Sequence, residues 1–177
     1  RYKHAPKPTS LSPPARTVGA VISFDPQILP DIAPGGFSHL IVMVDEKSGF
    51  ISVVGSQNKT TSKMFEALRH VITTTYNAHG HPVRKLHGDA ESVNMSLTEP
   101  LGIIACSIVA SLPGDHAQRV ERHWQDLINA VISVLSSLSY YLPKKYVLLA
   151  LQFAANAQNS LISKRSSPYT PNELVYK

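Results

Sequence analysis

Cysteine is nearly absent from this chain of 177 residues, in which Cys106 stands alone. A single cysteine excludes an internal disulfide framework, so we expect a protein of a reducing compartment. Long apolar runs are absent too, and no stretch approaches the roughly 20 residues that a membrane-spanning helix needs. The sequence therefore predicts neither a signal peptide nor contact with a membrane.

Acidic residues are also scarce, with 12 Asp and Glu against 17 Lys and Arg and a net charge of +5. This excess is compatible with an acidic partner such as nucleic acid, and equally with ordinary surface solvation. Apolar residues are plentiful at 43% of the chain, which is enough for one well-packed core. Length and composition together indicate one globular domain with extensions at both ends.

Proline marks the first of three predicted regions. Four prolines lie among basic residues in the first 16 positions, and this composition resists both helix formation and strand pairing. We expect a proline-rich basic linker over residues 1–17, a folded core over 18–160 and a C-terminal extension over 161–177. Because the chain starts without methionine, we also expect it to be a piece of a longer protein.

Apolar periodicity and turn residues predict an α/β fold with three strands, a helix, two more strands and two further helices. A strand–helix–strand order favours parallel pairing with a right-handed crossover. We therefore expect a five-stranded mixed sheet, three antiparallel strands followed by two parallel ones, flanked by helices. The predicted strands are 18–24, 37–44, 50–54, 83–87 and 102–109, and the helices begin at Thr60 or Thr61, at a cap on Asp115, and after Pro143.

Three acids occupy special places in this pattern. Asp25 follows the first apolar strand, Asp89 follows the fourth strand, and Glu121 lies one turn inside the second helix. A carboxylate at a strand end is held on rigid backbone while it stays open to solvent. That setting suits a divalent cation, which prefers oxygen ligands, and a phosphodiester substrate. Trp124, on the same helix as Glu121, is expected to pack in the core.

Several short motifs resemble, in order, the catalytic core of copia-type retrotransposon integrases, with retroviral integrases more distant. The resembling stretches cover most of residues 18–177 and are 22–25, 35–50, 83–89, 120–122, the helix after Pro143, Asn159 and 170–174. The resemblance implies a ribonuclease-H-like fold, with residues 18–160 as the catalytic core. It also implies that Asp25, Asp89 and Glu121 are the catalytic and metal-binding acids.

The same resemblance implies a function, which is DNA integration by 3'-end processing and strand transfer of retroelement DNA into target DNA. Two Mg²⁺ or Mn²⁺ ions would act as cofactors, because a pair of ions can stabilise the attacking and leaving oxygens of an in-line displacement. The expected partners are element ends, target DNA and further copies of the chain in a homodimer or higher oligomer. The expected location is the nucleus, with a stage in cytoplasmic particles.

Basic residues near the acids are candidates for DNA contact. Arg119 and Arg122 flank Glu121 and are one helical turn apart, so both can face a phosphate backbone. Lys144 and Lys145 add a second basic pair. For these lysines a solvated surface is the alternative interpretation.

The chain departs from the integrase pattern in two ways. Glu121 follows Asp89 by 32 positions, a shorter interval than the family shows, and the glycines expected after Asp89 and before Glu121 are missing. These departures leave open a lapsed or domesticated module that binds nucleic acid or protein without catalysis. A stand-alone nuclease of the same fold is a third hypothesis, and it would require a fourth acid, for which Glu91 is the candidate.

Other polar residues have simpler interpretations. Asp45 falls in a predicted hairpin turn and Asp115 at a helix cap, so neither is expected to bind metal. His70, His79, His81 and His87 have no cysteine partner at zinc-binding spacing. The sequence therefore predicts a carboxylate site and no zinc site.

Overall fold

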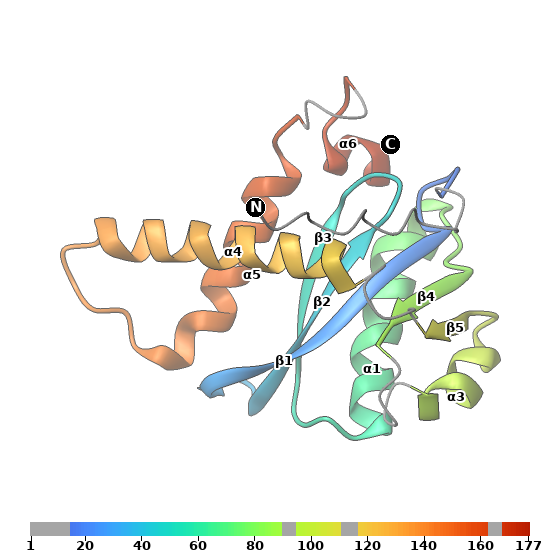
Figure 1. Cartoon of the computed structure of the whole chain (residues 1–177), viewed down its shortest axis with the longest axis horizontal. Helices are drawn as coiled ribbons and strands as arrows, with labels where there is room; N and C mark the ends of the chain where they lie inside the picture. Colours follow the sequence, from blue (N-terminus) through green and yellow to red (C-terminus); the bar gives the residue numbers. More distant parts are fainter. Residues whose placement is uncertain (1–14, 90–94, 111–116, 163–167) are drawn as a thin grey trace, which may run out of the picture.

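The computed structural model describes residues 15–89, 95–110, 117–162 and 168–177, with the backbone alone at 117–119. Its centre is a mixed sheet with the strand order β3-β2-β1-β4-β5 (Figure 1). β1 pairs with β2 and β2 with β3 in antiparallel fashion, while β1–β4 and β4–β5 are parallel, which confirms the predicted fold class. The strands are β1 (Val21–Ala33), β2 (Phe37–Asp45), β3 (Ile51–Ser56), β4 (Lys85–Gly88) and β5 (Ser107–Ala110).

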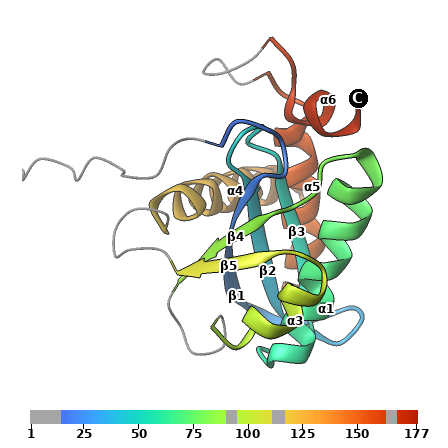
Figure 2. The same ribbon diagram turned by 90° about the vertical axis from the view of Figure 1, so that its right-hand side faces the viewer.

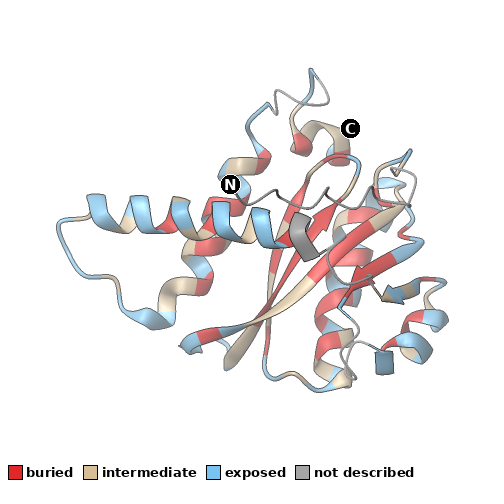
Figure 3. Cartoon of the chain, in the orientation of Figure 1, coloured by how far each residue is buried: buried red, intermediate tan, exposed pale blue. Residues whose placement is uncertain are grey.

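Helices cover both faces of the sheet (Figure 2). Successive side chains of a strand point to opposite faces. β2 therefore sends Ile41 and Met43 into the core beneath α1, and Leu40, Val42 and Val44 into the core beneath α4 and α5. β2 is buried on both sides, while the outer part of α4 and the α4–α5 connection are exposed (Figure 3). The helices named here are α1 (Thr61–Val71), α4 (Ala117–Ser137) and α5 (Val147–Asn159).

The remaining elements are short. α1 runs on through a π turn (Ile72–Tyr76) and a 3₁₀ turn (Asn77–His79), and it ends at Gly80, whose φ of 78° favours glycine. α3 (Thr98–Ile103) precedes β5, and a 3₁₀ turn (Lys144–Tyr146) precedes α5. None of the described helices is long and apolar enough to cross a membrane.

The last helix, α6 (Pro171–Tyr176), begins with a capping box. Thr170 accepts a hydrogen bond from the Glu173 backbone N–H, and the Glu173 side chain accepts one from the Thr170 N–H. Val175 of this helix is completely buried in the core beneath α1. The α6 helix thus packs on the sheet domain, and the predicted domain boundaries stay a prediction.

The prediction of a strand over 102–109 was wrong for its first half. Residues up to Ile103 belong to α3, and only Ser107–Ala110 forms a strand. Leu101 reaches the core from the helix, whereas Ile103 is 82% exposed, so the apolar run serves two elements instead of one buried strand. The chain turns between them at Ala105, which has a φ of 57°, and Cys106 then enters the core as expected.

The first strand is longer than predicted, and Asp25 lies inside it instead of at its end. β1 runs through Pro26 and Pro30 to Ala33. The Val21 carbonyl accepts a hydrogen bond from Glu46 at the end of β2, so odd-numbered residues of β1 direct their backbone groups toward β2. Pro26 therefore points to the other edge, beyond the end of the β1–β4 pairing, where its missing N–H group is not needed, and Pro30 lies in the stretch where the β1–β2 register shifts.

Candidate active site

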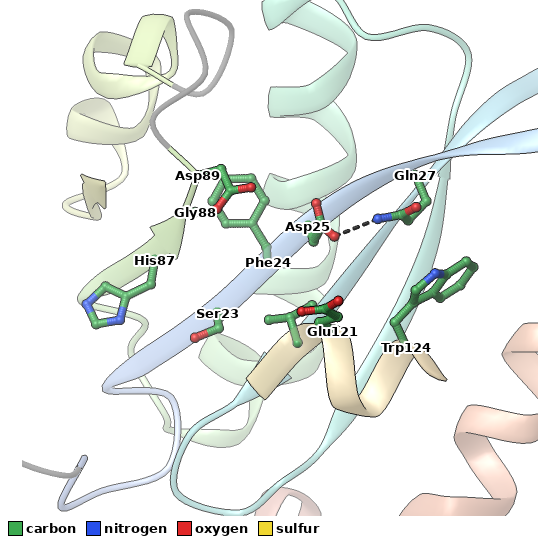
Figure 4. Close-up of a pocket in the computed structure, with 10 residues that line it drawn as sticks. Ser23, Phe24, Asp25, Gln27, His87, Gly88, Asp89, Glu121 and Trp124 are labelled. Atoms are coloured by element: carbon green, nitrogen blue, oxygen red, sulfur yellow. Dashed lines mark hydrogen bonds between the residues drawn. The ribbon is translucent and has the colours of Figure 1, made fainter. Parts of the chain in front are cut away.

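One pocket of about 290 Å³ contains all three predicted catalytic acids (Figure 4). Asp25 comes from β1, Asp89 from the residue after β4, and Glu121 from the first turns of α4. Asp25 is half-buried, while Asp89 and Glu121 are exposed. The lining consists of Ser23, Phe24, Asp25, Gln27, His87, Gly88, Asp89, Val120, Glu121 and Trp124.

The parallel pairing of β1 with β4 explains why Asp25 and Asp89 meet. Ser23 lies opposite His87 in this ladder. Asp25 lies two residues further along β1, and Asp89 lies two residues after His87, one past the end of β4, so both continue on the face that Ser23 and His87 share. Their meeting depends on the sheet register and not on the strand-end position that was predicted for Asp25.

A close contact between Phe24 and Gly88 fixes the spacing of the two strands at this point. A Cβ atom at Gly88 would lie 2.6 Å from the Phe24 ring. Phe24 itself is only 2% exposed and cannot swing into solvent without losing its core packing. Only glycine fits at the position that immediately precedes Asp89.

Asp25 has a neighbour that sequence reasoning missed. The Gln27 Nε2 atom donates a hydrogen bond of 2.5 Å to Asp25 Oδ2. The two residues are two apart on one strand, so their side chains share a face, and this spacing is the signal that was overlooked. The hydrogen bond orients the carboxylate within the pocket.

The other end of the pocket rests on a buried polar cluster of Ser23, Glu46 and His87. Glu46 Oε1 accepts a hydrogen bond from Ser23 Oγ at 3.1 Å and lies 3.0 Å from His87 Nδ1. The Glu46 and His87 side chains are both 7% exposed. The cluster joins β1, β4 and the β2–β3 turn, two of its members line the pocket, and no sequence motif had indicated it.

The chemistry of the donor set fits a hard divalent cation, although the acids do not form one compact triad. Across the described ranges, no three His, Cys, Asp or Glu side chains are arranged to hold a single ion. Mg²⁺ is usually bound by one or two carboxylates together with water and substrate phosphates, so a pair of acids per ion is sufficient. Asp25, Asp89 and Glu121 are the carboxylates that line this pocket.

Asp45 lies outside the pocket, as the last residue of β2 before the turn to β3. It is completely buried, accepts hydrogen bonds from the Gly19 N–H at 2.8 Å and the Ser48 N–H at 2.7 Å, and stabilises the turn. Burial raises its pKa above the ordinary value of 3.8. Asp115 and Glu91 are outside the described residues.

The predicted DNA-contacting residues are not gathered at one place. Arg122 is exposed beside Glu121, and the Arg119 side chain falls outside what the structure describes. Lys144 and Lys145 lie in the 3₁₀ turn beyond the far end of α4, where the Lys145 Nζ atom is 5.2 Å from the centre of the Tyr146 ring. None of Arg122, Lys144 and Lys145 lines the pocket.

Trp124 has two environments. It packs partly against the core beneath α4 and α5, as predicted, and it also lines the pocket beside the acids. The helical spacing of apolar residues had indicated the first role. Its three-residue distance from Glu121, which places both side chains on one side of α4, indicates the second.

Comparison with known proteins gives similarity at the level of structure. No protein-family model matches the chain, and no curated protein sequence matches it. A chain of the simian T-cell lymphotropic virus intasome, solved in complex with the PP2A regulatory subunit B56 gamma, is similar with a TM-score of 0.71 at 17% identity. The match covers 97% of this chain and 59% of that one, so this chain spans little more than half of its length.

Two isolated catalytic core domains are similar over nearly their whole length. The BIV integrase core gives a TM-score of 0.63 at 17% identity and covers 89% of this chain and 93% of its own. The HTLV-2 integrase core, solved in complex with magnesium, gives a TM-score of 0.66 at 18% identity. This match covers 90% of this chain and 98% of the HTLV-2 core. The chain thus has the ribonuclease-H-like fold of a retroviral integrase catalytic core.

Proposed function

We propose that this chain is the catalytic core of a DNA integrase, a metal-dependent polynucleotidyl transferase of the copia retrotransposon type. One observation carries the proposal: Asp25, Asp89 and Glu121, assigned from short motifs, all line a single pocket. The fold shared with integrase cores supports it, and so does the order of the copia-like motifs along the chain.

In the proposed mechanism the three acids are the protein ligands of two metal ions. Asp25, oriented by its hydrogen bond from Gln27, would be a ligand to both ions, and Asp89 and Glu121 would each hold one of them. When bound, Mg²⁺ or Mn²⁺ supplies charge stabilisation to the attacking and leaving oxygens of the phosphodiester. The HTLV-2 integrase core was solved in complex with magnesium, which supports this choice of cation.

The surrounding residues position the DNA in this proposal. Arg119 and Arg122, which belong to the helix of Glu121, are assigned phosphate contacts that do not read sequence. Lys144 and Lys145 extend the basic surface at the other end of α4. The DNA partners are element ends and target DNA, the assembly is a homodimer or higher oligomer, and the place of action is the nucleus.

The decisive test is a strand-transfer and disintegration assay on branched oligonucleotides with Mn²⁺. We expect activity from the unchanged protein, and a loss of about a thousandfold in Asp25→Asn, Asp89→Asn and Glu121→Gln, because each loses several kcal/mol of charge stabilisation. Asp31→Asn on β1 and Asp126→Asn on α4 are matched controls, since both acids lie outside the pocket. Full activity of the three pocket variants would refute the assignment of the acids.

A second candidate is a lapsed integrase-like module that binds nucleic acid or protein. The absence of a compact three-acid group from the described residues favours it, as do the missing glycines near Asp89 and Glu121. The two candidates differ in one measurement. A folded protein that binds DNA but shows no turnover with Mn²⁺ would support the lapsed module.

A further inference from the structure

The end of the pocket next to Asp25 is formed by an aromatic ring and an amide. Figure 4 shows Trp124 and Gln27 at this end, on the side of Asp25 away from His87. The indole packs partly against the core, so its orientation is restrained while part of its surface lines the pocket. Val120 and Leu127 of the same helix are almost completely buried and supply the core contact, so packing by itself does not require an indole at the pocket wall.

Both side chains keep hydrogen-bonding capacity that no described residue of the chain uses. Gln27 uses its Nε2 atom to bond Asp25, which fixes the amide plane and leaves the Oε1 atom as an acceptor. Within the part of the chain that the structure describes, no group hydrogen-bonds to this oxygen or to the Trp124 indole N–H. The pocket wall therefore presents an aromatic surface, one acceptor and one donor beside the proposed metal-binding acids.

We propose that Trp124 and Gln27 form a subsite for one unpaired nucleobase of the DNA strand whose phosphate reaches Asp25. The base stacks on the indole, and its donor groups bond the Gln27 oxygen. A volume of about 290 Å³ is just below the range of roughly 300–1,000 Å³ for small-molecule sites, which suits a single nucleotide unit. This inference rests on the proposed function. It specifies which part of the DNA substrate the pocket binds, namely one unpaired base.

The subsite tolerates any base, because every base has a π face that stacks on an aromatic ring. It requires that the base be out of the duplex, since a paired base is covered by its neighbours. The pocket therefore selects frayed or single-stranded DNA ends next to the reacting phosphate. Base stacking of this kind contributes roughly ten- to a hundredfold to affinity.

Trp124 is the only tryptophan of the chain, so its fluorescence reports on this site alone. We would titrate the protein with two short single-stranded oligonucleotides that differ only in an abasic spacer in place of the bases near the 3' end. A fluorescein label would measure binding of each by anisotropy, independently of the tryptophan signal. We expect the base-containing strand to quench Trp124 and bind about tenfold more tightly, while the abasic strand binds by charge without quenching.

Variants separate stacking from packing. Trp124→Phe retains the aromatic surface and is expected to retain most of the preference for the base-containing strand, whereas Trp124→Ala loses it. Gln27→Leu is expected to weaken binding of the base-containing strand by a few fold and to leave the abasic strand unaffected. Tyr141→Ala, an exposed aromatic outside the pocket, is the matched control and should change neither affinity. Thermal melting of each variant confirms that it is folded.

The failure of this inference differs from the failure of the proposed function. Equal quenching and equal affinity for the two strands, in a preparation active on branched DNA, would overturn the subsite and leave the integrase proposal standing. A base-dependent quench without any turnover would support the subsite in a lapsed module. If neither strand binds, both proposals are wrong.

Discussion

Asp25 and Asp89 reach the pocket through the sheet, whereas Glu121 reaches it through a helix. The β1–β4 ladder ends at Ser23 opposite His87, and each aspartate follows two residues later, beside the close approach of Phe24 to Gly88. Glu121 lies near the start of α4, and its position depends on how this helix packs on β1 and β2 through Val120, Leu127 and Val131. Backbone hydrogen bonds fix the first pair, and side-chain packing fixes the third acid.

This difference predicts where the site tolerates change. A ladder holds residues to one register, because a one-residue slip would turn every side chain to the opposite face. A helix can shift along the sheet by small amounts while its apolar face stays buried. The shortened interval between Asp89 and Glu121 therefore affects Glu121, whose position on a helix is more adjustable than the positions of the two strand aspartates.

The largest effect is expected from loosening the helix. Leu127 is completely buried beneath α4, and Leu127→Ala should lower the free energy of unfolding by about 2–5 kcal/mol through the cavity that it leaves. Chemical denaturation measures this change. Ile132→Ala on the same helix, where the side chain is 55% exposed, is the control and should stay within about 0.5 kcal/mol of the unchanged protein. Equal losses in the two variants would mean that α4 is not anchored as described.

The stability gained on metal binding should depend more on Asp25, in the sheet, than on Glu121, on the helix. At a Mg²⁺ or Mn²⁺ concentration about a hundredfold above the dissociation constant, the folded protein should gain about 2.7 kcal/mol, seen as a higher melting temperature. Asp25→Asn should abolish the gain, because Asp25 is proposed to contact both ions. Glu121→Gln should keep part of it, because Asp25 and Asp89 still form a pair. A melting curve of the unchanged protein that divalent cations leave unmoved would argue against the metal site.

A smaller effect is expected at the strand contact itself. Gly88→Ala places a methyl group against the Phe24 ring, and such overpacking typically costs about 1–3 kcal/mol. The displaced strand end should also reduce turnover, because it carries Asp89. Gly102→Ala in α3 is the matched control, since a Cβ there meets no atom within 4 Å and alanine favours helix. Denaturation curves should thus shift in opposite directions, and a Gly88→Ala protein of unchanged stability and activity would contradict the close fit.

Much of the site was predictable from local patterns. Apolar alternation located β2 and β3, helical spacing located α1 and α4, and the acids followed from their places after or within these elements. A short helical stretch was expected before residue 102, and α3 lies there, but its last residues were assigned to the strand because the apolar run at 101–109 has the same composition in either element. The extension of β1 past Pro26 and Pro30 was missed because proline indicates a break unless the open edge of the strand is known.

The polar neighbours of the acids could not be predicted for a different reason. Glu46 and His87 are 41 positions apart, and Ser23 is 23 positions from Glu46. Their association depends on which strands pair and in which register. Gln27 lies closer in sequence to Asp25, but its importance appears only when α4 brings Trp124 to the same pocket.

By itself, the sequence determined the residue types that are available for chemistry and the local elements that carry them, because side-chain periodicity and turn preferences act over a few residues. Only the tertiary structure decided that Asp25 and Asp89 share one face of the sheet, that Glu121 joins them, and that Trp124 faces their pocket as well as the core. The physical reason is that these relations arise from strand pairing and from the packing of α4 on the sheet. Strand pairing and helix packing both join residues that are far apart in the chain, so a pattern within a few residues cannot predict which of them meet.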